Sequence, residues 1–134
     1  QAETLAAVRA GVAAIQCLGE VILPFPLGIV RSGSKVGSKY RQLKASTNDA
    51  WCPTLRGLTR SDLREGENAV YELVIDGLSA GAVAGAMQAA INEVSKCPGV
   101  LRISAGNYGG KLGPHHFHLH RLSEMQETQV QAKL

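Results

Sequence analysis

Hydrophobic residues recur at two different spacings along this chain, and those spacings predict its helices and strands. Apolar residues three and four positions apart over residues 3–18 predict a first helix that buries Leu5, Val8, Val12 and Ile15. A similar spacing predicts a second helix from Ser79, its N-cap, to about Lys96, with an inner stripe of Val83, Met87, Ile91 and Val94. Gly19 and the Pro98-Gly99 pair are placed to end these helices.

Alternation of apolar and polar residues predicts the strands, most clearly over residues 69–76. One face of that strand carries Val70, Glu72, Val74 and Asp76, and the other carries Tyr71, Leu73 and Ile75. Shorter strands are predicted at 20–23, 100–104 and 116–122.

Two segments between these elements lack a regular pattern. Residues 28–59 are irregular, with extended pieces expected around 28–30 and 39–44. So long an excursion is expected to be functional or to pack against another part of the protein. Residues 60–68 are charged, which predicts a solvated connection.

The order of these elements fits an α+β, ferredoxin-like domain that lacks its first strand. One additional strand before the first helix gives β-α-β-β-α-β, an antiparallel sheet with two helices packed on one face. We expect this lobe to span residues 1–122 and a polar tail to span 123–134. The chain begins with Gln1 and enters a helical pattern at once, so we expect a fragment of a longer protein.

Composition agrees with a single globular domain and narrows its class. The 134 residues are 45% hydrophobic and 19% charged, which argues against disorder, and a net charge of +3 does not by itself indicate nucleic-acid binding. Cys17, Cys52 and Cys97 have neither disulfide-framework nor zinc spacing, which favours buried thiols in a reducing cytoplasm. The chain shows no secretory signal and no membrane-spanning stretch.

Two segments are candidates for anion binding. The first has five cations and no carboxylate, namely Arg31, Lys35, Lys39, Arg41 and Lys44. It would attract an anionic ligand, although composition equally fits a solvated basic loop. The second is the glycine-rich turn over 106–113, where Lys111 adds charge to a possible backbone nest. A tight turn between strands explains it as well, and it lacks nucleotide-binding spacing.

Glu72 is the first candidate for catalysis. It lies in mid-strand between Val70 and Val74, where desolvation would raise its pKa and keep it protonated near neutral pH. A neutral carboxylic acid can donate a hydrogen bond to a developing oxyanion. The alternative is a glutamate on an edge strand that points into water.

The last predicted strand carries a candidate metal site, a face formed by His116, His118 and His120. Two of these imidazoles could bind zinc, but a zinc site needs a third ligand and a supporting carboxylate, so a polar strand face is the alternative. Ser32 and Ser34 lack the G-x-S-x-G frame of a hydrolase nucleophile.

Several long motifs together resemble the formylmethanofuran–tetrahydromethanopterin formyltransferases. The run PFPLGIVRSGSKVGSKY over residues 24–40 is similar to a segment of that family, as are LKASTN at 43–48 and WCP at 51–53. AVYELVIDGL at 69–78 resembles a family strand, and ISAGNYGGKLG at 103–113 resembles a family turn letter for letter. The order of the motifs agrees from the first helix to about Leu122, and the 31–37 run looks more like the bacterial branch.

The resemblance implies that this chain is the second of two tandem ferredoxin-like lobes of a cytoplasmic enzyme. It implies formyl transfer between methanofuran and tetrahydromethanopterin, or its dephospho form, with no metal and no tightly bound cofactor. It also implies a homo-oligomer whose active sites lie in clefts between lobes and subunits, and an association with formylmethanofuran hydrolase subunits in some bacteria. Glu72 matches the glutamate that the family is thought to use as a protonated acid.

The resemblance also assigns substrate contacts and marks departures from the family. The expected substrate-binding residues are Ser32, Ser34, Lys35, Lys39, Lys44, Asn107, Tyr108 and Lys111. Leu27 replaces a usual glycine, Pro114-His115 replaces a more basic stretch, and the tail outruns the usual end. The alternative function is a catalytically silent lobe that holds together a formyltransferase–hydrolase complex.

Overall fold

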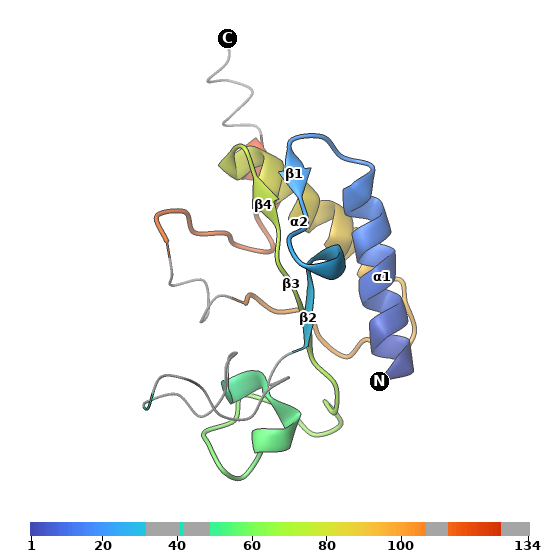
Figure 1. Cartoon of the computed structure of the whole chain (residues 1–134), viewed down its shortest axis with the longest axis vertical. Coiled ribbons are helices and arrows are strands. Elements are labelled where there is room, and N and C mark those ends of the chain that lie inside the picture. The colour runs from blue at the N-terminus through green and yellow to red at the C-terminus, as the bar shows by residue number, and fades with distance from the viewer. Residues whose placement is uncertain (32–40, 42–48, 107–112, 127–134) are drawn as a thin grey trace.

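Two helices packed on a narrow antiparallel ribbon form the centre of the molecule (Figure 1). The computed structural model describes residues 1–31, 41, 49–106 and 113–126. The helices are α1 (Ala2–Gln16) and α2 (Ala80–Val94). The strands are β1 (Val21–Ile22), β2 (Ile29–Arg31), β3 (Tyr71–Leu73) and β4 (Asp76–Gly77). Short 3₁₀ turns lie at Pro26–Gly28, Asp49–Trp51 and Pro53–Leu55. The expected α+β class with antiparallel pairing is confirmed.

The ribbon consists of two antiparallel pairs, β1 with β4 and β2 with β3. In the first pair Ile22 lies opposite Asp76, and in the second Val30 lies opposite Glu72. The strand predicted over 69–76 is therefore split into β3 and β4, because the turn at Pro26–Gly28 interrupts the facing strand between β1 and β2.

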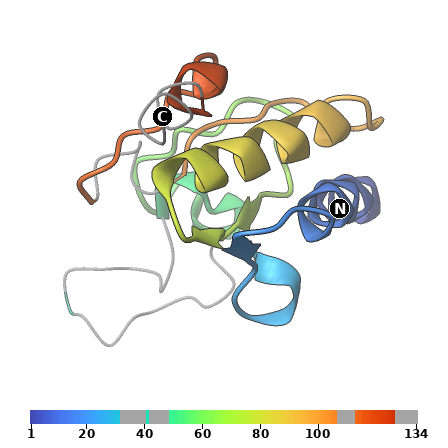
Figure 2. The same cartoon turned by 90° about the horizontal axis from the view of Figure 1, so that it is seen from above.

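Small residues let the two helices approach closely over the ribbon. The buried residues of α2 are Gly81, Ala84, Ala86 and Ala90. The predicted inner stripe of Val83, Met87, Ile91 and Val94 is only partly buried, because the alanine face turns inward. In α1 the predicted Val8, Val12 and Ile15 are buried, whereas Leu5 is half-exposed. A Cβ atom at Gly11 would lie 2.9 Å from Val94 Cγ2, so this position tolerates no side chain without movement. Figure 2 shows α2 lying across the molecule while α1 is seen nearly end-on.

The helix ends agree with the sequence at α2 and differ at α1. Ser79 caps α2 as predicted, since its Oγ accepts a hydrogen bond from the Ala82 amide at 3.1 Å. The first helix ends earlier than expected, at Gln16. The left-handed residue that follows is Glu20, with φ 63°, rather than Gly19. Leu27 also has a left-handed φ of 62°, a conformation that glycine adopts more readily than leucine.

Most of the charged segment 60–68 is exposed, as predicted for a solvated connection, but Glu67 within it is buried. The Glu67 carboxylate accepts hydrogen bonds at 2.7 Å from the Arg64 amide and from the Arg102 guanidinium. Arg102 also donates to the Asp62 carbonyl at 2.9 Å, and its guanidinium lies 4.6 Å from the centre of the Trp51 ring. This cluster joins the 49–68 excursion to the chain after α2.

The C-terminal part departs furthest from the predicted elements. Residues 100–104 and 116–122 are not strands. Within the described part of the chain, no backbone hydrogen bond joins residues 100–106 to another segment, and the Leu101 side chain is 66% exposed. Residues 122–126 form a helical turn, where a polar tail was expected to begin. Leu122 is fully buried, and a Cβ atom added at Gly85 of α2 would lie 3.7 Å from Gln126.

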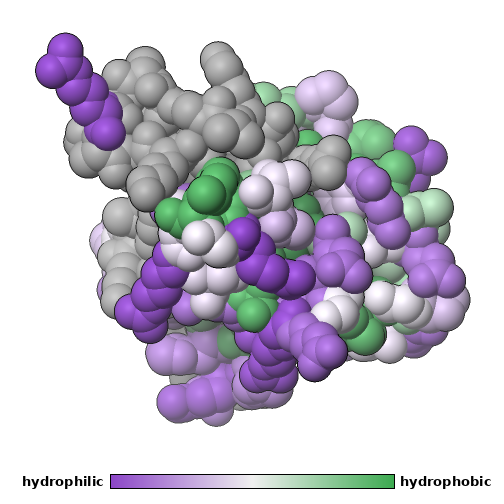
Figure 3. Space-filling model, turned by 90° about the horizontal axis from the view of Figure 1, so that it is seen from below, coloured by the Kyte–Doolittle hydropathy of each residue, from purple (hydrophilic) through white to green (hydrophobic). Residues whose placement is uncertain are grey.

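One face of the molecule is dominated by polar side chains. The face in Figure 3 is mostly hydrophilic, with small separate hydrophobic areas. None of the helices described is long and apolar enough to cross a membrane.

Of the three thiols, Cys52 is buried as predicted and Cys97 is partly buried, whereas Cys17 is exposed, which corrects the expectation for that residue.

The left-handed backbone at Glu20 predicts that glycine is more stable there. We expect Glu20→Gly to raise the free energy of unfolding by about 1 kcal/mol, because a left-handed conformation costs a residue with a Cβ atom about 1–2 kcal/mol. Glu65, which is also exposed but lacks a positive φ, supplies the control: Glu65→Gly should destabilise the protein. Urea unfolding of both variants measures the difference, and equal effects would contradict the argument.

The Glu67 cluster predicts a stability that depends on pH. Burial alone would raise the pKa of Glu67, but the Arg64 amide and the Arg102 guanidinium together hold its pKa below the ordinary value of 4.5. The carboxylate therefore contributes stability above pH 4.5, and that contribution is lost as the pH falls through the lowered pKa.

We accordingly expect Glu67→Gln to cost about 2 kcal/mol of unfolding free energy at pH 7. The difference in unfolding free energy between wild type and Glu67→Gln should become smaller in acid. Glu65→Gln, at an exposed neighbouring position, should change stability little at either pH. A gap of the same size at pH 7 and pH 3 in urea unfolding would show that the charge of Glu67 is not what stabilises the cluster.

Candidate functional site

Glu72 lies on the face of the ribbon that the helices leave uncovered. Its neighbours Leu73 and Ile75 pack against the core formed by Ile15, Ala86 and Ala90. Because side chains alternate along a strand, Glu72 points to the opposite face, as Asp76 does at the exposed end of the same face. The predicted separation of the two faces is confirmed by this packing.

The surroundings of Glu72 differ from those of a glutamate in open solvent. The residue is partly buried and lies opposite Val30 of β2, in the middle of a strand pair. Asp76, in contrast, is exposed. Among the described strands β3 pairs only with β2, so Glu72 is partly buried on an edge strand, and both its desolvation and its protonation stay predictions.

The turn before β2 fixes the backbone beside Glu72. The Gly28 carbonyl accepts a hydrogen bond at 2.9 Å from the Val74 amide, two residues from Glu72. Gly28 is buried with φ 68°, and a Cβ atom there would lie 2.7 Å from the Val74 carbonyl oxygen. Only glycine fits this approach, so the position of the turn against β3 is tightly constrained.

The expected substrate-binding residues cannot be placed around Glu72. All eight of them lie outside the described residues: Ser32, Ser34, Lys35, Lys39, Lys44, Asn107, Tyr108 and Lys111. The chain does enter the first of these segments directly from β2, whose last residue, Arg31, lies opposite Tyr71. Their roles remain predictions that rest on the sequence.

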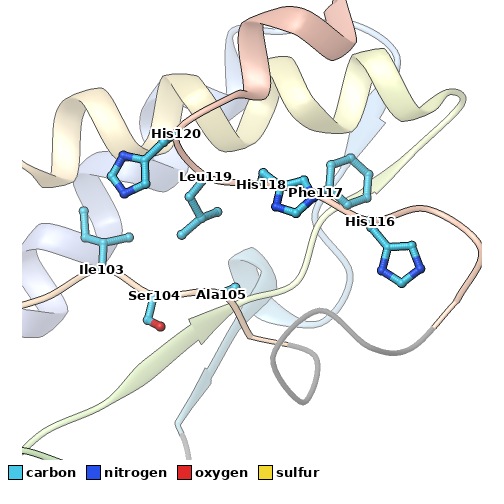
Figure 4. A pocket seen from close by; sticks show the side chains of 8 residues that line it. All are labelled: Ile103, Ser104, Ala105, His116, Phe117, His118, Leu119 and His120. Carbon is cyan, nitrogen blue, oxygen red and sulfur yellow. The ribbon is translucent and has the colours of Figure 1, made fainter.

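The histidines line a shallow hollow at the C-terminal part of the chain. A space of about 320 Å³ separates residues 103–105 from residues 116–120. In Figure 4 Leu119 points into this space, whereas His116 and His120 lie at opposite ends of it. Among the described residues, no group of three or more histidine, cysteine, aspartate or glutamate side chains is suited to a metal. All three imidazoles are exposed, which agrees with the polar-face alternative although the backbone is not a strand.

Two features of the site region have no clear signal in the sequence: the cluster of Glu67, Arg102 and Trp51, and an apolar hollow near the end of α1. Glu67 stands in a run of charges, and its partner Arg102 lies 35 residues away, so no local signal marks its burial. The apolar hollow is lined by residues from α1 and from the segment after it, including Ile15 and Leu23. The aliphatic run at 21–23 was its only signal, and that run also fits an ordinary strand.

These observations define a class of structure, namely an α+β lobe whose open sheet face carries a partly buried carboxyl. The family described as "FTR, proximal lobe" matches residues 1–122. The chain therefore belongs to the formylmethanofuran–tetrahydromethanopterin formyltransferase family, and the resemblance inferred from its motifs is confirmed.

Individual relatives agree with this assignment. Over 125 residues the chain is 54% identical to the formylmethanofuran–tetrahydromethanopterin formyltransferase of Methylococcus capsulatus, with 91% of this chain and 42% of the relative covered. The solved formylmethanofuran:tetrahydromethanopterin formyltransferase from Methanosarcina barkeri is similar with a TM-score of 0.77 and 46% identity, covering 91% of this chain and 42% of that one.

A third similarity is to the formyltransferase/hydrolase complex from Methylorubrum extorquens, solved with methylofuran. Its TM-score is 0.72 at 45% identity, covering 91% of this chain and 41% of that one. The chain thus spans about two fifths of the length of the proteins that it matches.

Proposed function

We propose that the full-length protein transfers a formyl group between formylmethanofuran and tetrahydromethanopterin, or the dephospho form of the pterin. The observation that carries this proposal is the position of Glu72. A carboxyl is held partly buried, mid-strand, on the open sheet face of a lobe that belongs to a formyltransferase family. The relatives named above bear this activity in their names.

In the proposed reaction a ring nitrogen of the reduced pterin attacks the formamide carbonyl carbon of formylmethanofuran. A new carbon–nitrogen bond forms, and the carbonyl oxygen becomes an oxyanion in the tetrahedral intermediate. The protonated carboxyl of Glu72 donates a hydrogen bond to that oxyanion. The intermediate then collapses, the bond to the methanofuran amine breaks, and the proton lost by the pterin nitrogen is returned to the leaving amine. No metal and no tightly bound cofactor takes part in this scheme.

The ferredoxin-like plan belongs to the same proposal. Residues 100–106 have no backbone partner within the described part of the chain, and Leu101 and Ile103 are exposed. β3 pairs only with β2 among the described strands. An additional strand between β3 and the 100–104 segment would pair both edges and complete β-α-β-β-α-β. In this proposal the basic segment (residues 31–44) and the glycine-rich segment (residues 106–113) bind the acidic arms of the two coenzymes.

The proposed hydrolase partner follows from one relative, and the proposed homo-oligomer follows from the family resemblance. The full-length protein forms a homo-oligomer and, in this proposal, associates with hydrolase subunits as the Methylorubrum extorquens relative does in its complex. That complex also supports a second candidate, in which the lobe holds subunits together without catalysing transfer. The two candidate functions make different predictions. A substitution in this lobe can change the rate of formyl transfer directly only if the lobe takes part in catalysis.

Glu72→Gln in the full-length protein distinguishes them. The amide of glutamine is a much weaker hydrogen-bond donor than a carboxylic acid, so we expect formyl transfer to fall by up to about two to three orders of magnitude. Transfer is followed by the absorbance change of the pterin, and thermal unfolding checks that the fold is kept. Asp76→Asn, on the same face but exposed, is the matched control and should keep most of its activity. Full activity of Glu72→Gln would remove Glu72 from the mechanism and favour the silent lobe.

A further inference from the structure

One arginine side chain, Arg102, joins parts of the chain that are far apart in sequence. Its guanidinium donates to the Glu67 carboxylate at 2.7 Å and lies 4.6 Å from the centre of the Trp51 ring. These three residues are the Glu67 cluster. The Arg64 amide donates to the same carboxylate oxygen at 2.7 Å, and Arg102 also donates to the Asp62 carbonyl at 2.9 Å. The Arg102 and Glu67 side chains are 21% and 9% exposed, so their ion pair is largely shielded from water.

Main-chain hydrogen bonds extend the Glu67 cluster through the 49–68 excursion. The Asp62 amide donates to the Ala50 carbonyl at 2.9 Å, and Ala50 precedes Trp51 in the same 3₁₀ turn. Figure 1 shows this excursion beyond the end of β2, at the opposite end of the ribbon from β1. The cluster and this bond together fix the two ends of the excursion to each other.

The segment after α2 depends on the same arginine. Within the described part of the chain, residues 100–106 share no backbone hydrogen bond with another segment. Leu101 and Ile103, on either side of Arg102, are 66% and 37% exposed. The hydrogen bonds that the structure describes between this segment and the rest of the protein therefore come from the Arg102 guanidinium.

The Glu67 cluster lies, along the chain, between the two segments that are proposed to bind the coenzymes. Trp51 comes soon after the basic segment (residues 31–44), and Arg102 comes shortly before the glycine-rich segment (residues 106–113). The contact between Trp51 and Arg102 thus ties the chain after one binding segment to the chain before the other. Binding groups whose attachment points are fixed in advance lose less conformational freedom when the ligand binds.

We propose that Arg102 is a positioning residue for coenzyme binding, which acts through the Glu67 cluster and touches neither coenzyme. This inference rests on the proposed function and assigns that function an additional residue. Arginine suits the role, because its planar guanidinium is always charged, donates in several directions and stacks on an aromatic ring. Lysine supplies the charge alone. A cluster that only stabilises the fold is the alternative, and it would leave coenzyme affinity unchanged.

Calorimetric titration of the full-length protein with each coenzyme separates these two roles. We expect Arg102→Lys to raise the dissociation constant of at least one coenzyme about tenfold or more, because the binding segments lose their common attachment. The turnover number at saturating coenzyme should change less than about threefold, since the reacting groups are untouched.

Substitutions of Trp51 test the stacking contact itself. Trp51→Phe keeps an aromatic ring under the guanidinium and should bind both coenzymes within about threefold of wild type. Trp51→Leu removes the ring and should weaken binding as Arg102→Lys does. This pair also decides the matter if Arg102→Lys fails to fold. Equal affinities in the two Trp51 variants would contradict the proposal.

Ile15→Val is the control for loss of stability alone. Ile15 is 1% exposed in the helical core, and removing its methylene group should lower the melting temperature. Its residue lies outside the Glu67 cluster, so coenzyme affinity should stay at the wild-type value. Unchanged affinity in a folded Arg102→Lys protein would overturn the proposal, as would an equal loss of affinity in Ile15→Val.

Formyl transfer by the wild-type protein, measured on the same preparation, keeps this inference distinct from the proposed function. Binding without transfer would overturn the proposed function, and weaker binding by Arg102→Lys would still support the positioning role. Transfer by wild type with unchanged affinity in the variants would overturn the positioning role alone. A wild-type protein that binds neither coenzyme would overturn both.

Discussion

The close packing of α1 against α2 is the constraint on which the other features depend. Gly11 and the alanines of α2 allow the helices to approach until Val94 would touch any side chain at position 11. Leu73 and Ile75 pack against the core beneath these helices. With those two side chains turned inward, alternation along the strand leaves Glu72 on the uncovered face. The orientation of the candidate acid is thus set by the helix contact on the far side of the sheet.

The local elements could be predicted from the sequence where short-range chemistry determines them. Ser79 marked the start of α2 through a hydrogen bond that spans three residues, and alternation along 69–76 separated Glu72 from the core. The long family motifs identified the lobe, because their order and length exceed any chance similarity. These features need only neighbouring residues to be recognised.

Features that rest on distant partners could not be predicted in the same way. The inner face of α2 was assigned to its larger aliphatic residues, but the close helix contact selects alanine instead. Glu67 resembled a solvated charge because Arg102 lies far away in sequence. The 100–104 segment has the alternation of a strand, yet no described strand pairs with it. All eight expected coenzyme contacts fall outside the described residues, so that part of the site rests on sequence alone.

The stacking of Arg102 on Trp51 has a practical consequence. Trp51 is the single tryptophan of the chain, and its indole ring lies against the guanidinium that pairs with Glu67. Its fluorescence therefore originates at the joint between the long excursion and the segment after α2. Its emission therefore reports whether the contact between Trp51, Arg102 and Glu67 is formed, and no attached dye is needed. The same measurement works beside partner subunits if their own tryptophans are replaced.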